Sequence, residues 1–187
     1  MGPKPRDRLP MTTQIPESHS PLDPPVSILF VCLGNICRSP MDEGIFLSLL
    51  DGDPRFTVDS AGTGSWHVGE VPDPRARAVS RDHGIVLESR GRQVTASDLE
   101  TFDIVVAMDQ SNLAQLQHLQ SENGRRGGDG SLRTDHPSEL YLLRSFDPEA
   151  ATNDLDVPDP YWDDDGFSGV FEMLRRSLEV LLDELEA

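Results

Sequence analysis

The chain has 187 residues, of which 36% are hydrophobic, and this is enough for one domain with a sizeable core. Its net charge of −17 argues against nucleic acid as a partner, because such binding depends on neutralising phosphate groups. No stretch approaches the roughly 20 apolar residues of a membrane helix, and the N-terminus lacks the apolar core of a signal peptide. Because the chain also has only two cysteines, a disulfide scaffold is not expected. We therefore expect a cytoplasmic protein without a membrane segment.

The first elements in chain order are a tail, a strand and a helix. Residues 1–25 hold seven prolines and no periodic apolar pattern, which predicts a disordered tail before one domain over residues 26–187. Residues 28–31 are a short apolar run typical of a strand buried on both faces. A tight loop follows, and Ser39-Pro40 marks the start of a helix that continues to about Asp51.

The remaining elements alternate between strands and helices. We expect a strand over residues 56–59, a glycine-rich loop over 60–69, a helix over 72–83, an extended piece over 85–87, a helical turn over 95–99, a strand over 102–107, a helix over 109–119, a flexible insertion over 121–135, a strand over 139–143 and a closing helix from Phe167. This order predicts an α/β fold with a central, mostly parallel four-stranded sheet and helices on both faces. A loop at the carboxyl end of the first strand is where such sheets bind ligands.

The loop between Cys32 and Arg38 has the features of an anion trap. Its backbone N–H groups can point inward, and the positive end of the following helix adds to the same field. This environment favours the thiolate form of Cys32. The planar fork of Arg38 matches two oxygens of a phosphate dianion. A nucleophilic sulfur beneath a bound tetrahedral anion indicates attack on phosphorus.

This loop, with sequence VCLGNICRSP, resembles the Cys-x5-Arg phosphate loop of low-molecular-weight protein tyrosine phosphatases. VDSAGTGSWHVGEVPDPRA over residues 58–76, FDIVVAMDQSNL over 102–113 and VPDPYW over 157–162 resemble the same family in its usual order. The resemblance implies hydrolysis of phosphotyrosine monoesters through a phosphocysteine on Cys32, with Arg38 binding phosphate. It also implies that Asp159 is the general acid and base, a role for which Asp156 is the alternative.

The resemblance further implies how the substrate is bound. The phosphate loop contributes Leu33, Gly34, Asn35, Ile36, Cys37 and Ser39, and the walls of the cleft contain Trp66, His67, Tyr161 and Trp162. Relatives that act on phosphoarginine use threonine where this chain has Ile36, so Ile36 favours phosphotyrosine. Trp162 replaces the second tyrosine of the pair that is common in the family.

Other residues are expected to support the loop rather than to react. Ser39 has two interpretations, either as a helix N-cap or as a hydrogen-bond partner of the Cys32 sulfur, and we favour the second. Asn35 is expected to brace the loop with Ser60, and Asp109 to have a structural role. Ser89 stands where vertebrate relatives have a bracing histidine.

Two further side chains carry alternative interpretations. Cys37 is either a small buried residue or, as in many relatives, a partner that traps the oxidised nucleophile as a reversible disulfide. His83 precedes a glycine at a predicted helix end, which favours an interaction with the helix dipole over catalysis.

Three other functions were weighed. An arsenate reductase of the thioredoxin-coupled type requires further cysteines, and a phosphopeptide-binding module would need neither a nucleophile nor an acid. A metal-binding loop would need ligands beyond the two cysteines, so we expect no metal and no cofactor. The expected partners are phosphotyrosine proteins or small aryl phosphates, and the expected assembly is a monomer or weak dimer.

Overall fold

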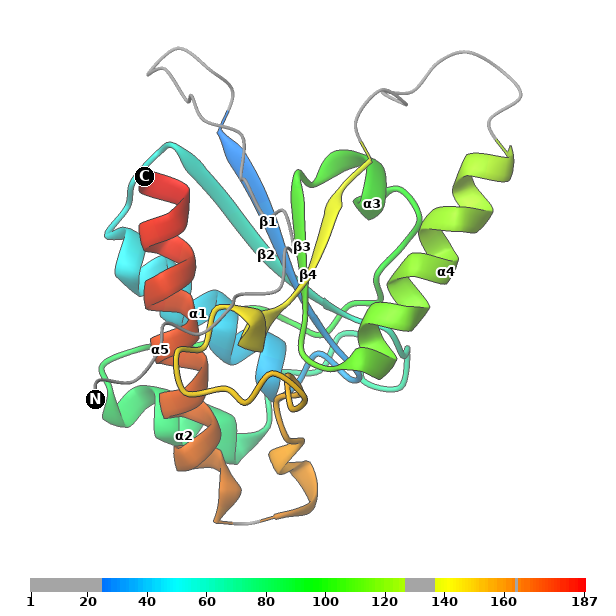
Figure 1. Ribbon diagram of the computed structural model, residues 1–187. Helices are drawn as coiled ribbons and strands as arrows, with labels where there is room; N and C mark the ends of the chain where they lie inside the picture. The colour runs from blue at the N-terminus through cyan, green and yellow to red at the C-terminus, as the bar shows by residue number, and fades with distance from the viewer. Residues whose placement is uncertain (1–24, 127–136, 164) are drawn as a thin grey trace.

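The computed structural model describes residues 25–126, 137–163 and 165–187, and a four-stranded parallel sheet forms its centre (Figure 1). The strands are β1 (Val26–Cys32), β2 (Phe56–Gly62), β3 (Ile104–Ala107) and β4 (Glu139–Leu142), in the order β2-β1-β3-β4. Every adjacent pair is parallel, which confirms the predicted fold class. The expected tail up to residue 24, and residues 127–135 of the expected insertion, lie outside the described ranges.

Helices cover both faces of this sheet, as Figure 1 shows. On one face lie α1 (Arg38–Leu50), α2 (Pro74–Asp82) and α5 (Gly166–Glu186), and on the other lie α3 (Asp98–Thr101) and α4 (Gln110–Arg126). Alternate residues of β1 serve the two cores: Phe30 and Cys32 belong to the cluster under α1 and α5, whereas Leu29 and Val31 belong to the cluster under α4. The short strand is therefore buried on both faces, which explains its continuous apolar sequence.

Two element boundaries differ from the prediction by several residues. β2 continues through Gly62 because it pairs in parallel register with β1 as far as Cys32, so residues 60–62 belong to the sheet and not to the glycine-rich loop. α4 continues to Arg126, so residues 121–126 are helical and not part of an insertion.

The other corrections are smaller. α2 begins at Pro74, because the Asp73 carboxylate accepts a hydrogen bond from the Arg75 N–H and caps the helix. β3 begins at Ile104, since Phe102 ends α3. β4 ends at Leu142, and two 3-10 turns, η1 (Leu143–Ser145) and η2 (Pro160–Trp162), follow it.

Within the residues that the structure describes, none of the helices has both the length and the apolar character needed to cross a bilayer.

Candidate active site

The loop between β1 and α1 lies at the carboxyl end of the sheet, and Asn35 determines its shape. Asn35 has a backbone φ of 55°, in the left-handed region that asparagine tolerates better than most residues. Its amide nitrogen donates to the hydroxyls of Ser39 and Ser60, both at 2.9 Å, and its amide oxygen accepts from the Arg92 backbone N–H at 2.9 Å. The expected contact between Asn35 and Ser60 is present, and the loop is tied to α1, β2 and the segment before α3.

The bracing network continues beyond the residues that the sequence indicated. The Ser60 hydroxyl donates to the Glu43 carboxylate at 2.6 Å. Burial raises the pKa of Glu43, and hydrogen bonds from Ser60 and Ser89 lower it in part. Ser89, at the position of the family's bracing histidine, therefore still contacts the network through Glu43. Sequence reasoning missed Glu43 and Arg92, because a charged residue in an isolated sequence gives no sign of a long-range partner.

The Cys32 thiol lies at the base of the loop and is 3% exposed. Its sulfur accepts a hydrogen bond from the Asn35 backbone N–H at 3.2 Å and lies 3.1 Å from the Ser39 hydroxyl. The same hydroxyl lies 3.2 Å from the Ala61 carbonyl oxygen. The sulfur thus lies within hydrogen-bonding distance of one backbone N–H and one hydroxyl group.

Ser39 is not the N-cap of α1. The helix begins at Arg38, and Cys37 occupies the capping position without a side-chain hydrogen bond. The Ser39 hydroxyl instead faces the Cys32 sulfur, the Asn35 amide and the Ala61 carbonyl inside the loop. Of the two interpretations drawn from the sequence, the contact with sulfur is the one that the structure contains.

Arg38 is buried at 3% exposure and is held from three directions. Its Nη1 donates to Asp109 at 2.8 Å and to the Val157 carbonyl at 2.9 Å, and its Nη2 contacts Asp159 at 3.3 Å. Its Nε–H is buried and has no partner. Burial alone would lower the pKa of Arg38, but the fields of Cys32, Asp159 and Asp109 outweigh it and raise that pKa, so the guanidinium is firmly cationic.

The two aspartates on Arg38 begin different elements. Asp109 precedes α4, where its carboxylate also accepts from the Asn112 backbone N–H, as expected for a capping residue with a structural role. Asp159 caps η2 by accepting from the Tyr161 backbone N–H at 3.2 Å, and its side chain is 31% exposed. Asp156, the alternative acid, instead accepts from the Gln110 backbone N–H at the start of α4. The structure thus brings Asp159 to the phosphate loop and directs Asp156 to the helix.

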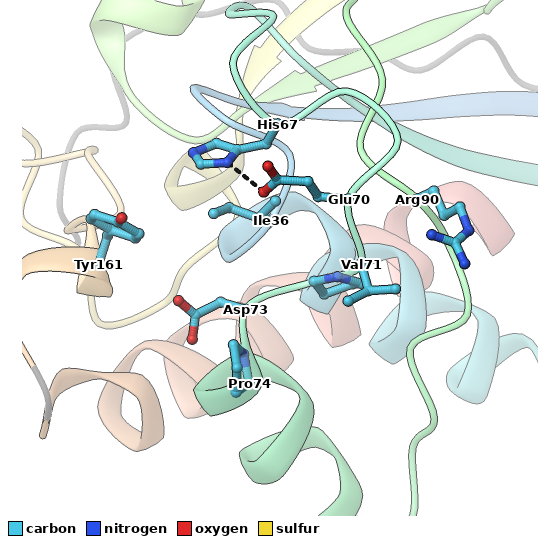
Figure 2. A pocket seen from close by; sticks show the side chains of 9 residues that line it. Ile36, His67, Glu70, Val71, Asp73, Pro74, Arg90 and Tyr161 are labelled. Atoms are coloured by element: carbon cyan, nitrogen blue, oxygen red, sulfur yellow. Dashed lines mark hydrogen bonds and ion pairs between the residues drawn. The ribbon is translucent and has the colours of Figure 1, made fainter.

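A cavity of about 480 Å³ opens beside the loop (Figure 2). Ile36 lies at its inner side, Tyr161 lies opposite, and His67 lies above them with its Nδ1 2.7 Å from the Glu70 carboxylate. Its other charged lining residues, Asp73 and Arg90, were not expected from the sequence. The complete lining consists of Ile36, His67, Glu70, Val71, Pro72, Asp73, Pro74, Arg90 and Tyr161.

The two tryptophans are not among the residues that line this cavity, and their role in the substrate cleft stays a prediction. Trp66 is 71% exposed, and its ring lies against Gly64. Trp162 is 85% exposed and meets the ring of Tyr161 edge to face, with centroids 5.0 Å apart. Aromatic character alone could not indicate which way these rings point, because both rings are mostly exposed and each contacts only a near neighbour in the sequence.

The remaining loop residues form its rim and its interior. Leu33 is 40% exposed at the rim, and Gly34 lies so close to His67 that a Cβ there would be 3.1 Å from the ring. Cys37 is buried and is a free thiol, as is Cys32. Burial, reinforced by the fields of Asp73 and Cys32, raises the pKa of Cys37, so its neutral form is favoured.

His83 interacts with helices and not with the phosphate loop. Its Nδ1 contacts the Val79 carbonyl at 2.9 Å, its Nε2 contacts Glu172 at 3.1 Å, and its ring stacks on Phe171. Within the described ranges, no three His, Cys, Asp or Glu side chains are grouped so that they could hold a metal ion.

Comparisons with known proteins agree with this geometry. The sequence model of the low molecular weight phosphotyrosine protein phosphatases matches residues 27–187. A low molecular weight protein-tyrosine-phosphatase of Streptomyces coelicolor is 41% identical, over 83% of this chain and 90% of its own length. The low molecular weight phosphotyrosine protein phosphatase of Sus scrofa is 36% identical, over 85% of this chain and 95% of its own length. The crystal structure of a Drosophila arginine phosphatase has a TM-score of 0.74 at 33% identity and covers 86% of this chain and 98% of its own.

The chain belongs to the low-molecular-weight phosphotyrosine protein phosphatase family. It is accordingly a low-molecular-weight protein-tyrosine-phosphatase, a hydrolase of phosphoric monoesters.

Proposed function

We propose that this enzyme hydrolyses phosphotyrosine monoesters in two steps through a phosphocysteine on Cys32. Arg38 holds the phosphate, and Asp159 acts first as general acid and then as general base. The observation that carries the proposal is the convergence of these three side chains on one loop, where the buried Nε–H of Arg38 lacks an acceptor. An unsatisfied buried donor is costly, and a phosphate oxygen would satisfy it.

Binding of phosphate requires only a local change at Arg38. Its Nη1 is anchored by Asp109 and by the Val157 carbonyl, so the guanidinium plane is held in place. Its contact with Asp159, at 3.3 Å, is longer than the roughly 2.7–2.9 Å of a strong charge-assisted hydrogen bond. A phosphate dianion offers a better acceptor pair to Nε and Nη2, so it can displace the Asp159 carboxylate from the arginine.

In the first step, the Cys32 thiolate attacks phosphorus. The sulfur–phosphorus bond forms as the bond from phosphorus to the aryl oxygen breaks, while the loop N–H groups and Arg38 stabilise the equatorial oxygens. Asp159, in its protonated form, gives its proton to the departing aryl oxygen. Its partial exposure beside Tyr161 gives it access to that oxygen at the mouth of the site.

In the second step, water cleaves the phosphocysteine. Asp159, now a carboxylate, accepts a proton from the attacking water, and the sulfur leaves with the bonding electron pair. The Ser39 hydroxyl, 3.1 Å from the sulfur, stabilises the returning thiolate. Inorganic phosphate is released and the enzyme returns to its starting form.

The mouth of the site supports an aryl substrate. Ile36 and Tyr161 both line the cavity, and their apolar surfaces suit a flat ring (Figure 2). We therefore propose phosphotyrosine proteins or small aryl phosphates as substrates, with phosphoarginine as the alternative that the Drosophila relative makes worth testing. A monomer or weak dimer remains our prediction for the assembly, to be measured by light scattering.

The test is phosphate release from a phosphotyrosine peptide in the presence of a chelator. Wild type is compared with Cys32→Ser, Asp159→Asn and, as a matched control, Asp156→Asn, which removes a carboxylate three residues away that caps α4. We expect no turnover with Cys32→Ser and a loss of about 100-fold or more in kcat with Asp159→Asn. Asp156→Asn should retain far more activity than Asp159→Asn.

Two results would count against this mechanism. If Asp156→Asn is the more damaged variant, the acid has been misassigned. If wild type binds the peptide but releases no phosphate, the protein is a phosphopeptide-binding module. A phosphoarginine peptide assayed in parallel decides the substrate class, and faster release from it would refute the preference for phosphotyrosine.

A further inference from the structure

Helix α1 contains a fully buried carboxyl group that the proposed reaction does not use. Asp42 has no exposed surface, and neither of its carboxyl oxygens has a hydrogen-bond partner. Other buried carboxyl groups of the described chain are paired: Asp73 with Arg75 and Asp147 with Arg176. A buried, unpaired carboxyl group destabilises a protein unless it remains neutral.

Arg38 lies one helical turn before Asp42 on the same helix. Side chains four residues apart share one face of a helix, and the charge of Arg38 is the one that acts on the Asp42 carboxyl group. The Nε–H of Arg38 is the complementary group, because it is a buried donor without an acceptor. An unsatisfied donor of the phosphate site and two unsatisfied acceptors therefore lie one turn apart on the buried face of α1.

Burial raises the pKa of Asp42 well above that of an ordinary aspartate, and the nearby Arg38 lowers it only in part. Arg38 is in turn faced by Cys32 from β1, by Asp109 before α4 and by Asp159 before η2. At Asp42 the effect of burial therefore outweighs the field of Arg38.

Within the residues that the structure describes, no charged side chain forms a hydrogen bond or ion pair with Asp42. Glu43, the next residue of α1, is hydrogen-bonded to Ser60 on the β2 side. The state of Asp42 is therefore coupled chiefly to Arg38.

We propose that Asp42 is a positioning residue that acts through Arg38, an inference that rests on the proposed role of Arg38 in binding phosphate. As a neutral acid, Asp42 leaves the Nε–H of Arg38 to the phosphate. When Asp42 releases its proton to solvent, its carboxylate accepts the hydrogen bond from that Nε–H and competes with phosphate for it. Phosphate affinity therefore falls with rising pH by a route additional to the titration of phosphate itself.

The experiment is a titration of inorganic phosphate into the whole protein by calorimetry, from about pH 5.5 to about pH 9. Wild type is compared with Asp42→Asn, which has the same shape but cannot ionise. Asp51→Asn is the matched control: it removes one carboxylate from the exposed end of the same helix, where the backbone φ of 47° suits asparagine. At each pH the ratio of two dissociation constants cancels the titrations that all the proteins share.

We expect the ratio of the wild-type dissociation constant to that of Asp42→Asn to rise by about tenfold across this range, the loss that one hydrogen bond to a charged group represents. Asp51→Asn should follow wild type. A ratio that stays constant with pH, or an equal rise with Asp51→Asn, would overturn the proposal. Asp42→Ala repeats the measurement if Asp42→Asn does not fold.

Calorimetry needs no turnover, and this separates the two proposals. A protein that binds phosphate with the expected pH-dependent ratio but hydrolyses no phosphotyrosine would refute the proposed function and leave the role of Asp42 intact. A protein that hydrolyses phosphotyrosine with a constant ratio would refute only the role of Asp42.

Discussion

Replacing Asn35 with alanine should destabilise the whole domain as well as the phosphate loop. The side chain makes three hydrogen bonds, to the hydroxyls of Ser39 and Ser60 and from the Arg92 backbone N–H, all at 2.9 Å. Its backbone has a φ of 55°, which alanine adopts less readily than asparagine. The substitution therefore removes a local brace and adds backbone strain at the same position.

The size of the effect follows from these contacts. Each buried hydrogen bond contributes about 1 kcal/mol, and the left-handed conformation costs alanine about 1 kcal/mol more than asparagine. The sum is a loss of about 4 kcal/mol, a large fraction of the roughly 5–15 kcal/mol by which domains are stable. Asn35→Gly loses the same hydrogen bonds without the strain, so it should be destabilised by about 1 kcal/mol less than alanine at this position.

Urea unfolding of wild type, Asn35→Ala and Asn35→Gly measures these free energies, and phosphate calorimetry reports on the loop. We expect both variants to bind phosphate at least about tenfold more weakly, because the loop N–H groups lose their fixed orientation. An alanine variant that is within about 1 kcal/mol of wild type would refute the reasoning, since none of the three hydrogen bonds could then contribute as assumed.

Three further substitutions test other parts of the site. Ser39→Ala should slow the second chemical step by about tenfold, which a rapid burst of aryl alcohol before slow turnover would show. A steady rate without a burst would argue that the contact between the Ser39 hydroxyl and the Cys32 sulfur does not assist this step. Gly62→Ala would place a Cβ 2.8 Å from a backbone oxygen of the phosphate loop, so kcat/KM should fall more than about tenfold. The control Gly169→Ala has open space around the new Cβ and should leave kcat/KM unchanged. Asp42→Asn should stabilise the protein by more than about 1 kcal/mol near pH 7. Burial raises the pKa of this carboxyl group in the folded protein, so wild type loses stability as pH rises above the unfolded pKa of 3.8. Equal stability of the two proteins in urea between pH 4 and pH 7 would contradict this.

The fold and the centre of the site could be predicted because their signals are local. The apolar run of β1, the Gly34-Asn35 pair and the start of α1 lie within one short stretch, and together they define the loop with Cys32 and Arg38 at its ends. Asp159 has a local signal as well, because prolines on both sides fix its backbone. Such features depend on neighbouring residues, which a sequence shows directly.

The features that sequence reasoning missed depend on contacts between distant segments. β2 extends to Gly62 because β1 offers it a partner, although Ser-Ala-Gly is a poor strand sequence. Glu43 and Arg92 brace the loop from two different segments, and no spacing rule links them. Asp42 depends even more on distant contacts. An acidic residue in a helix is expected to face water, and only the packing of α1 shows that Asp42 is buried.

In the proposed mechanism, the contact between Arg38 and Asp159 would link binding to catalysis. Asp159 is a second carboxylate partner of the buried guanidinium, beside Asp109. When phosphate takes Nε and Nη2, as proposed, the Asp159 carboxyl group is released from the arginine and lies free beside the bound substrate. Substrate binding would thus prepare the general acid, and release of phosphate would restore the ion pair. The weak 3.3 Å contact suits this cycle, because a shorter one would compete more strongly with the substrate.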